Sequence, residues 1–101
     1  MTASFEQIIN SCDPVLIDFS DSYSQSCKAL AGIIKQVKDS LGNRIKVVKI
    51  DIDENDRLSK EYQISSVPTL LLFQNGKQLW RKSGLPAKME ILLAILEKSN
   101  S

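Results

Sequence analysis

The residue best suited to chemistry in this chain is Cys27, in the segment Ser24-Gln25-Ser26-Cys27-Lys28. A short apolar run precedes the segment and a helical pattern follows it. The thiol is therefore expected in the first turn of a helix that follows a central strand. Backbone N–H groups and the helix dipole favour a thiolate at such a position. Asp18 lies within the apolar run, where burial is expected to raise the pKa of its carboxyl. Such a carboxyl can pass a proton to a buried thiol nearby.

Each of these side chains also has a purely structural interpretation. Cys27 falls on the apolar face of its helix, where a buried and unreactive cysteine is common. Ser24 stands where a helix N-cap would, and its hydroxyl can accept a hydrogen bond from a first-turn N–H. Cys12 continues the apolar stripe of a first helix and is expected in the core. A five-residue strand separates the two cysteines by about 15 Å or more, so no disulfide between them is expected.

The composition narrows the chemistry further. The chain has 101 residues, enough for a single domain, and its 13 basic and 12 acidic residues give a formal net charge of +1. It contains no histidine, which excludes a Ser-His-Asp triad, a Cys-His pair and a His-ligated metal. The near-neutral charge and the lack of an 18-residue apolar run argue against nucleic-acid and membrane partners. We expect one domain over 1–101, a monomer without metal or other cofactor. Since residues 1–6 lack a signal-peptide pattern, a cytoplasmic location is expected.

Hydrophobic periodicity predicts the elements that hold these residues. The expected helices are 5–12, 27–41, 54–62 and 89–96. The expected strands are 15–19, 45–52, 69–73 and 77–83, the second of them buried. The apolar face of the last helix is assigned to Met89, Leu92, Leu93 and Leu96. Two βαβ-type connections imply parallel strands, and the Asn75-Gly76 pair implies an antiparallel hairpin. The expected fold is α/β: a mixed four-stranded sheet sandwiched between helices in three layers.

Several segments, taken in order along the chain, resemble the thioredoxin family. Residues 24–28 stand where that family has Cys-Gly-Pro-Cys-Lys, after a strand that matches Val15–Phe19. Val67-Pro68-Thr69 matches the family's cis-proline loop, and Gly84 matches a glycine of its substrate groove. The resemblance covers nearly the whole chain. It implies a thioredoxin fold that lacks the family's usual first N-terminal strand.

The resemblance also implies roles for individual residues. Cys27 and Ser24 fall at the two catalytic positions, with Ser24 at the position of the family's attacking nucleophile. Asp18 matches the family's buried acid and Lys49 the lysine near it. Asp18 is then either a relic paired with Lys49 or a working proton relay. The residues implied to bind substrate are Tyr23, Val67, Pro68 and Gly84, with a cis peptide bond before Pro68.

The site departs from the family pattern most clearly at position 24. A serine hydroxyl is a very poor acid and cannot form a disulfide. The two-thiol cycle, which reduces a client protein and then closes its own disulfide, therefore cannot run at this site. The family's Gly-Pro is Gln25-Ser26 here, and its two flanking tryptophans are Ser20 and Tyr23. A serine first and a cysteine last also resembles thioredoxin-like co-chaperones that hold unfolded clients.

Two functions are compatible with these residues. The first is a thioredoxin-like protein of the thiol-disulfide, cell redox homeostasis type, in which Cys27 forms mixed disulfides with cysteine-containing client proteins. Glutathione or another thiol protein would resolve them. The second is a non-redox, chaperone-like module, whose groove beside Tyr23, Val67-Pro68 and Gly84 holds an extended or unfolded client by main-chain hydrogen bonds. The first function requires a Cys27 thiol that a client can reach, whereas the second does not.

Overall fold

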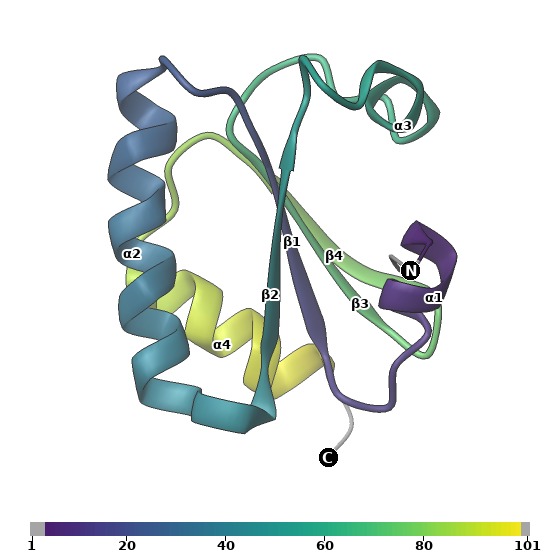
Figure 1. Ribbon diagram of the computed structural model, residues 1–101. Helices are drawn as coiled ribbons and strands as arrows, with labels where there is room; N and C mark the ends of the chain where they lie inside the picture. The colour runs from purple at the N-terminus through teal and green to yellow at the C-terminus, as the bar shows by residue number, and fades with distance from the viewer. Residues whose placement is uncertain (1–3, 100–101) are drawn as a thin grey trace.

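A mixed sheet of four strands forms the centre of the molecule (Figure 1). The computed structural model describes residues 4–99. The strands are β1 (Val15–Ser20), β2 (Lys46–Asp51), β3 (Thr69–Gln74) and β4 (Lys77–Ser83), in the spatial order β2-β1-β3-β4. The helices are α1 (Phe5–Ile9), α2 (Gln25–Leu41), α3 (Asp56–Glu61) and α4 (Lys88–Lys98), with a short 3-10 turn, η1 (Gly42–Arg44). Within the described residues the first element is α1, and the expectation of no strand before it falls partly on residues 1–3, which lie outside them.

The strand directions agree with the sequence in part. β1 and β2 are parallel, and the β3–β4 hairpin is antiparallel, as expected. Asn75 and Gly76 both have positive φ, which a two-residue hairpin turn of type I′ requires. The second expected parallel connection is wrong, because β3 is antiparallel to β1. The chain leaves β2 and enters β3 at the same end of the sheet, so it never returns to the other end.

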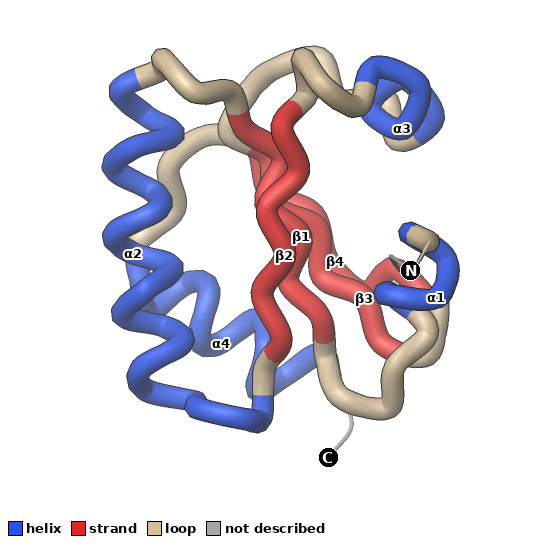
Figure 2. The backbone as a smooth tube through the Cα atoms, in the orientation of Figure 1, coloured by secondary structure: helices blue, strands red, loops and turns tan. Residues whose placement is uncertain are grey.

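Helices cover both faces of the sheet, which confirms the three layers (Figure 2). On one face, α2 and α4 pack against side chains such as Leu16, Leu70 and Leu72. On the other face, α1 and α3 contribute to a core around Phe19 and Phe73. The two central strands, β1 and β3, are buried along their whole length. The candidate site residues of β1 are therefore held by the most enclosed part of the fold.

Two expectations about burial are wrong. β2 was expected to be buried, but it lies at the edge of the sheet and its residues are half-buried or exposed. Cys12 was expected in the core of a helix over 5–12, but α1 ends at Ile9 and Cys12 is exposed. The helix stops because the chain turns towards the hairpin. There the carbonyls of Ile9 and Ser11 accept hydrogen bonds from the N–H groups of Gly76 and Asn75.

The last helix presents a different face from the expected one. Ile91, Ala94 and Ile95 are buried against the sheet and α2, whereas Met89 and Leu93 are exposed. Leu96 is exposed as well, and Leu92 is only partly buried. Both sets recur at helical spacing, so periodicity alone does not choose between them. Within residues 4–99, no helix is both long enough and apolar enough to span a bilayer.

Candidate functional site

The residues singled out in the sequence gather at one end of the sheet. Phe19, near the end of β1, pairs with Thr69 at the start of β3, and Thr69 pairs with Ser83 at the end of β4. The β1–α2 loop, the segment before β3 and the β4–α4 loop therefore share this end, at the top of Figure 1. Asp18 and Lys49 lie just below it, as register partners on β1 and β2.

Ser24 and Cys27 occupy the start of α2. Ser24 is the N-cap residue, as expected, but its hydroxyl makes no capping hydrogen bond. Cys27 lies in the first turn, and its side chain is only 2% exposed. Both cysteines are free, as the sequence predicted. The site therefore offers one thiol, held beneath the surface at a helix N-terminus.

Asp18 has the environment expected from its strand. Its side chain is 3% exposed, and one of its carboxyl oxygens, Oδ1, has no hydrogen-bond partner. Burial raises the pKa of this carboxyl to about 6, and the positive charge of Lys49 offsets part of that rise. The ion pairs among residues 4–99 are Lys60–Asp56 and Lys82–Glu90, so the Asp18–Lys49 ion pair, one of the two alternatives for this acid, is not formed. The carboxyl is thus poised to bind or release a proton near neutral pH.

A pocket of about 280 Å³ lies between α2 and β2, next to this carboxyl. It is lined by Asp18, Ala31, Ile34, Lys35, Lys38, Val47 and Lys49. Since Asp18 and two apolar residues of α2 line it together, the acid lies on the face of β1 that α2 covers. Asp18 and the thiol-bearing helix are therefore on the same side of the sheet.

The segment before β3 and the loop after β4 are joined directly. The peptide bond between Val67 and Pro68 is cis, and the N–H of Gly84 donates to the carbonyl of Pro68 at 2.9 Å. Val67 is half-buried and Pro68 is buried. Gly84 has a φ of +93°, and a Cβ built there would meet nothing within 4 Å. This position favours glycine for its backbone conformation, so close approach of a client is not needed to explain it.

Tyr23 stands at the rim of this end, with its side chain 69% exposed. Its pKa is raised mainly by the negative charge of Asp53, with further contributions from Asp21, from burial and from Asp51. These carboxylates come from the β1–α2 loop and from the end of β2, where the N–H of Ile52 donates to the carbonyl of Ser20. The exposed ring therefore stands in a locally acidic setting.

Asp21 is a residue of this site that sequence reasoning missed. It is 8% exposed, and its Oδ1 accepts hydrogen bonds from the N–H groups of Ser24 at 2.8 Å and Tyr23 at 3.3 Å. An aspartate in a loop can accept a hydrogen bond from the backbone N–H two residues later, which forms an Asx turn. This sequence signal is present in Asp21-Ser22-Tyr23-Ser24.

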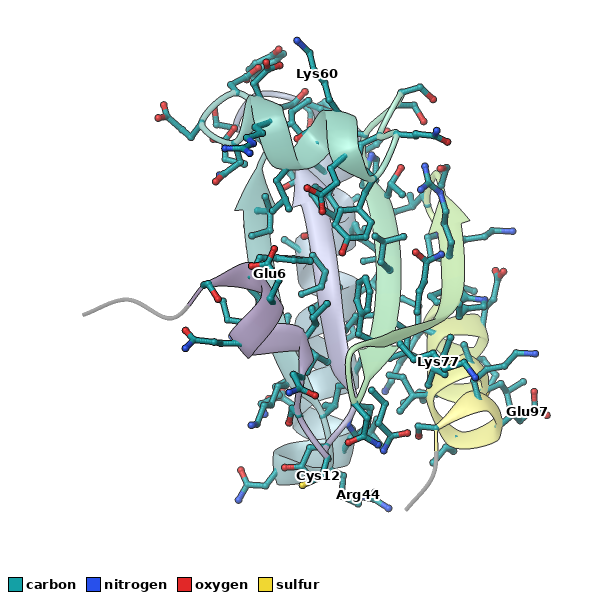
Figure 3. All side chains as sticks on the ribbon, turned by 90° about the vertical axis from the view of Figure 1, so that its right-hand side faces the viewer. Glu6, Cys12, Arg44, Lys60, Lys77 and Glu97 are labelled. Atoms are coloured by element: carbon teal, nitrogen blue, oxygen red, sulfur yellow. The ribbon has the colours of Figure 1, made fainter. Side chains whose placement is uncertain are left out.

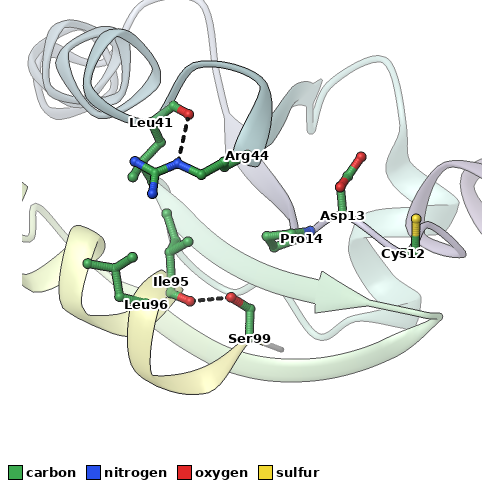
Figure 4. A pocket seen from close by; sticks show the side chains of 8 residues that line it. All are labelled: Cys12, Asp13, Pro14, Leu41, Arg44, Ile95, Leu96 and Ser99. Atoms are coloured by element: carbon green, nitrogen blue, oxygen red, sulfur yellow. Dashed lines mark hydrogen bonds between the residues drawn. The ribbon is translucent and has the colours of Figure 1, made fainter. Parts of the chain in front are cut away.

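Cys12 lies far from this site, at the opposite end of the sheet, before β1 begins. A pocket of about 330 Å³ there is lined by Cys12, Asp13, Pro14, Leu41, Arg44, Ile95, Leu96 and Ser99 (Figure 4). Figure 3 shows Cys12 and Arg44 at one end of the molecule and Lys60 of α3 at the other. Among residues 4–99, no group of three or more potential metal ligands was found.

Comparisons with known proteins point to one family. A family model described as Thioredoxin matches residues 1–98. The thioredoxin of Rickettsia conorii is 41% identical over 93 residues, which cover 91% of this chain and 89% of that protein. A solved structure of chloroplastic thioredoxin z is 28% identical, with a TM-score of 0.78 over 85% of this chain and 78% of that one.

The fold is matched by a further solved structure. It is that of thioredoxin-2, described as a component of the malaria parasite protein secretion machinery. The two chains are 24% identical, with a TM-score of 0.82 over 84% of this chain and 82% of the other. The likeness shows the α/β fold, with its mixed sheet in the order β2-β1-β3-β4 and flanking helices.

Proposed function

Since this chain belongs to the thioredoxin family, we propose that it acts in thiol–disulfide chemistry on client proteins through an altered, single-cysteine site. The observation that carries the proposal is the start of α2, where Cys27 is the only thiol and Ser24 stands three residues before it. Asp18, with a pKa of about 6, lies on the same side of the sheet and is the proposed proton acceptor for this thiol. The proposed partners are cysteine-containing client proteins.

In the proposed reaction, the Cys27 thiolate attacks one sulfur of a client disulfide. The client S–S bond breaks as the Cys27–client bond forms, and the second client sulfur leaves as a thiolate that takes up a proton. A thiolate from glutathione or another protein then attacks the client sulfur of the mixed disulfide. This second step returns Cys27 as a thiolate and leaves the external thiol bonded to the client.

The usual two-thiol turnover is proposed to be absent. Resolution within the site requires a second thiol close to Cys27, and Ser24 offers only a hydroxyl. A hydroxyl cannot attack the mixed disulfide as a thiolate would, and it cannot form a disulfide with Cys27. The loss is therefore chemical, and no rearrangement of the loop restores it.

The Ser24→Cys variant tests this proposal. We expect the wild-type chain to accelerate insulin disulfide reduction by dithiothreitol far less than Ser24→Cys does, because each mixed disulfide on Cys27 must be resolved by an external thiol. The turbidity of precipitating insulin chains measures the rate. Ser26→Cys is the matched control, because it adds a thiol beside Cys27 at the wrong spacing and should not exceed the wild-type rate. A wild-type rate as high as that of Ser24→Cys would contradict the loss of two-thiol turnover, and a folded Ser24→Cys no faster than wild type would show that more than one thiol has been lost.

A second candidate function rests on the burial of Cys27. A side chain that is 2% exposed offers little access to a client sulfur, whereas Tyr23 is exposed and Val67 is only half-buried. The alternative is a non-redox module that holds an extended or unfolded client by main-chain hydrogen bonds. Under this alternative, affinity depends on the rim and hardly at all on Cys27.

An unfolded probe without thiols separates the two functions. Reduced and carboxamidomethylated ribonuclease A stays unfolded and can form no disulfide with Cys27. If the module only holds clients, this probe should bind the wild type and Cys27→Ala alike and bind Tyr23→Ala more weakly. Ser22→Ala, at an exposed position of the same loop, is the control. If the probe does not bind, while a peptide disulfide is trapped on Cys27 and released by dithiothreitol, the thiol reaction is supported instead.

A further inference from the structure

The loop that leads into α2 is held by one carboxylate rather than by the expected serine cap. Asp21 follows β1 directly and is almost completely buried. Its Oδ1 accepts the N–H of Ser24 at 2.8 Å and that of Tyr23 at 3.3 Å, while the Ser24 hydroxyl caps nothing. Two consecutive backbone N–H groups thus point at the same oxygen. Asp21 sets the path of the chain from the sheet to the helix.

This arrangement fixes the backbone beneath an exposed ring. Tyr23 is 69% exposed, so its position depends on the backbone hydrogen bonds of its loop more than on packing of the ring. Before Asp21 the loop is anchored again, because the carbonyl of Ser20 accepts the N–H of Ile52 at 2.9 Å. A loop that is already ordered loses less conformational entropy when a partner binds to it.

We propose that Asp21 is a positioning residue, which holds the Tyr23–Ser24 backbone in the conformation that presents the tyrosine ring to a bound client segment. The inference rests on the second candidate function proposed above, since it requires that clients bind at this rim. Asp21 takes no part in the proposed thiol chemistry and contacts none of the reacting atoms. It acts on the backbone of Tyr23 and Ser24 through Oδ1, which accepts their N–H groups.

If Asp21 only stabilised α2 through its negative charge, Asp21→Asn and Asp21→Ala should have the same effect. A negative charge at the N-terminus of α2 stabilises the helix whether or not a client binds. Asp21→Asn removes that charge but keeps an acceptor oxygen for both N–H groups. Asp21→Ala removes both. Comparing the two variants therefore separates the hydrogen bonds from the charge.

The test measures the binding of fluorescently labelled, carboxamidomethylated ribonuclease A by anisotropy. We expect Asp21→Ala to raise the Kd by roughly three- to tenfold, the effect of ordering one side chain and its loop on binding. Asp21→Asn should stay within about twofold of the wild type. Ser59→Ala in α3 is the matched control, because it removes a side-chain hydrogen bond to the carbonyl of Asn55, the N-cap residue of that helix. Amide NMR signals of Tyr23 and Ser24 should shift strongly in Asp21→Ala and little in Asp21→Asn.

The outcomes separate this inference from the proposed function. If the wild type binds the probe and Asp21→Ala binds it equally well, the positioning role is overturned while client binding stands. If Asp21→Asn is as weak as Asp21→Ala, the charge acts and the hydrogen-bond role is overturned. If the wild type does not bind this probe, client binding at the rim fails, and the inference falls with it, while trapping of a peptide disulfide on Cys27 would leave the thiol reaction standing.

Discussion

At the scale of single residues, Asp18 shows how an enclosed position changes the chemistry of a side chain. Its carboxyl is buried in β1, one of its oxygens has no partner, and Lys49 forms no ion pair with it. Ionising this group costs free energy because water cannot solvate the charge. The raised pKa of about 6 is the measurable consequence.

The same shift predicts how stability depends on pH. In the unfolded chain the carboxyl ionises near 3.8, and in the folded chain near 6. Between these values the folded state holds a proton that the unfolded state has lost, so the contribution of Asp18 to stability falls as pH rises. The unfolding free energy of Asp18→Asn minus that of the wild type should therefore increase by roughly 2–3 kcal/mol from pH 4 to pH 8. Urea unfolding at both pH values measures this.

The control for this prediction is Asp39→Asn, which removes one negative charge from an exposed position on α2. Its difference from wild type should change far less over the same pH range. A difference for Asp18→Asn that stays constant with pH would show that the Asp18 carboxyl ionises alike in the folded and unfolded chains.

At the scale of elements, α4 shows how a helix with two apolar stripes is oriented. Ile91 and Ile95 pack into the core shared with α2. Met89, Leu93 and Leu96 recur at the same kind of spacing but face outward. Packing against the sheet and α2 selects the face of α4 that carries Ile91 and Ile95.

This orientation predicts unequal effects of two similar substitutions. Ile91→Ala removes a fully buried side chain and should lower the free energy of unfolding by about 2–5 kcal/mol. Leu93→Ala, on the same helix but about half exposed, should lower it by less than about 1 kcal/mol. Urea denaturation of both variants makes the comparison. A larger loss for Leu93→Ala than for Ile91→Ala would mean that α4 packs with the face expected from the sequence.

At the scale of the whole molecule, one sheet serves two cores. Leu72 points into the core beneath α2 and α4, and its neighbour Leu71 points into the core beneath α1 and α3. Successive residues of a strand face opposite sides of a sheet, so β3 contributes to both. If either layer of helices separated from the sheet, one face of β3 would be exposed to water. The same strand also forms part of the core beneath the other layer.

The shared sheet predicts a single unfolding transition. Leu71→Ala should lower stability by about 2–5 kcal/mol. It should shift the urea midpoint reported by Trp80 fluorescence as much as the midpoint from circular dichroism. Trp80 packs against the opposite core, around Leu72, so its response tests the coupling. Leu72→Ala is the matched variant on the tryptophan's own side. Two separated transitions in Leu71→Ala would show that the cores unfold independently.

Features that depend on the spacing of neighbouring residues could be predicted from the amino-acid sequence. The apolar run around Asp18, the helical repeat after Ser24 and the Asn75-Gly76 turn predicted elements that the structure contains. The direction of the Asp18 pKa shift also followed, because a carboxyl within an apolar central strand has few ways to remain in water. These predictions needed only the geometry of neighbouring residues along the chain.

Tertiary structure alone decided which groups are enclosed and which groups meet. β2 lies at the edge of the sheet, and β3 runs antiparallel to β1 instead of parallel as expected. Cys12 is exposed, and α4 buries the face that carries Ile91 and Ile95. The tertiary structure also left Asp18 without a close ion pair to Lys49 and gave Asp21 the two N–H groups of its loop. The physical reason is that burial and hydrogen-bond partners come from segments far apart in the chain, and periodicity records only near neighbours.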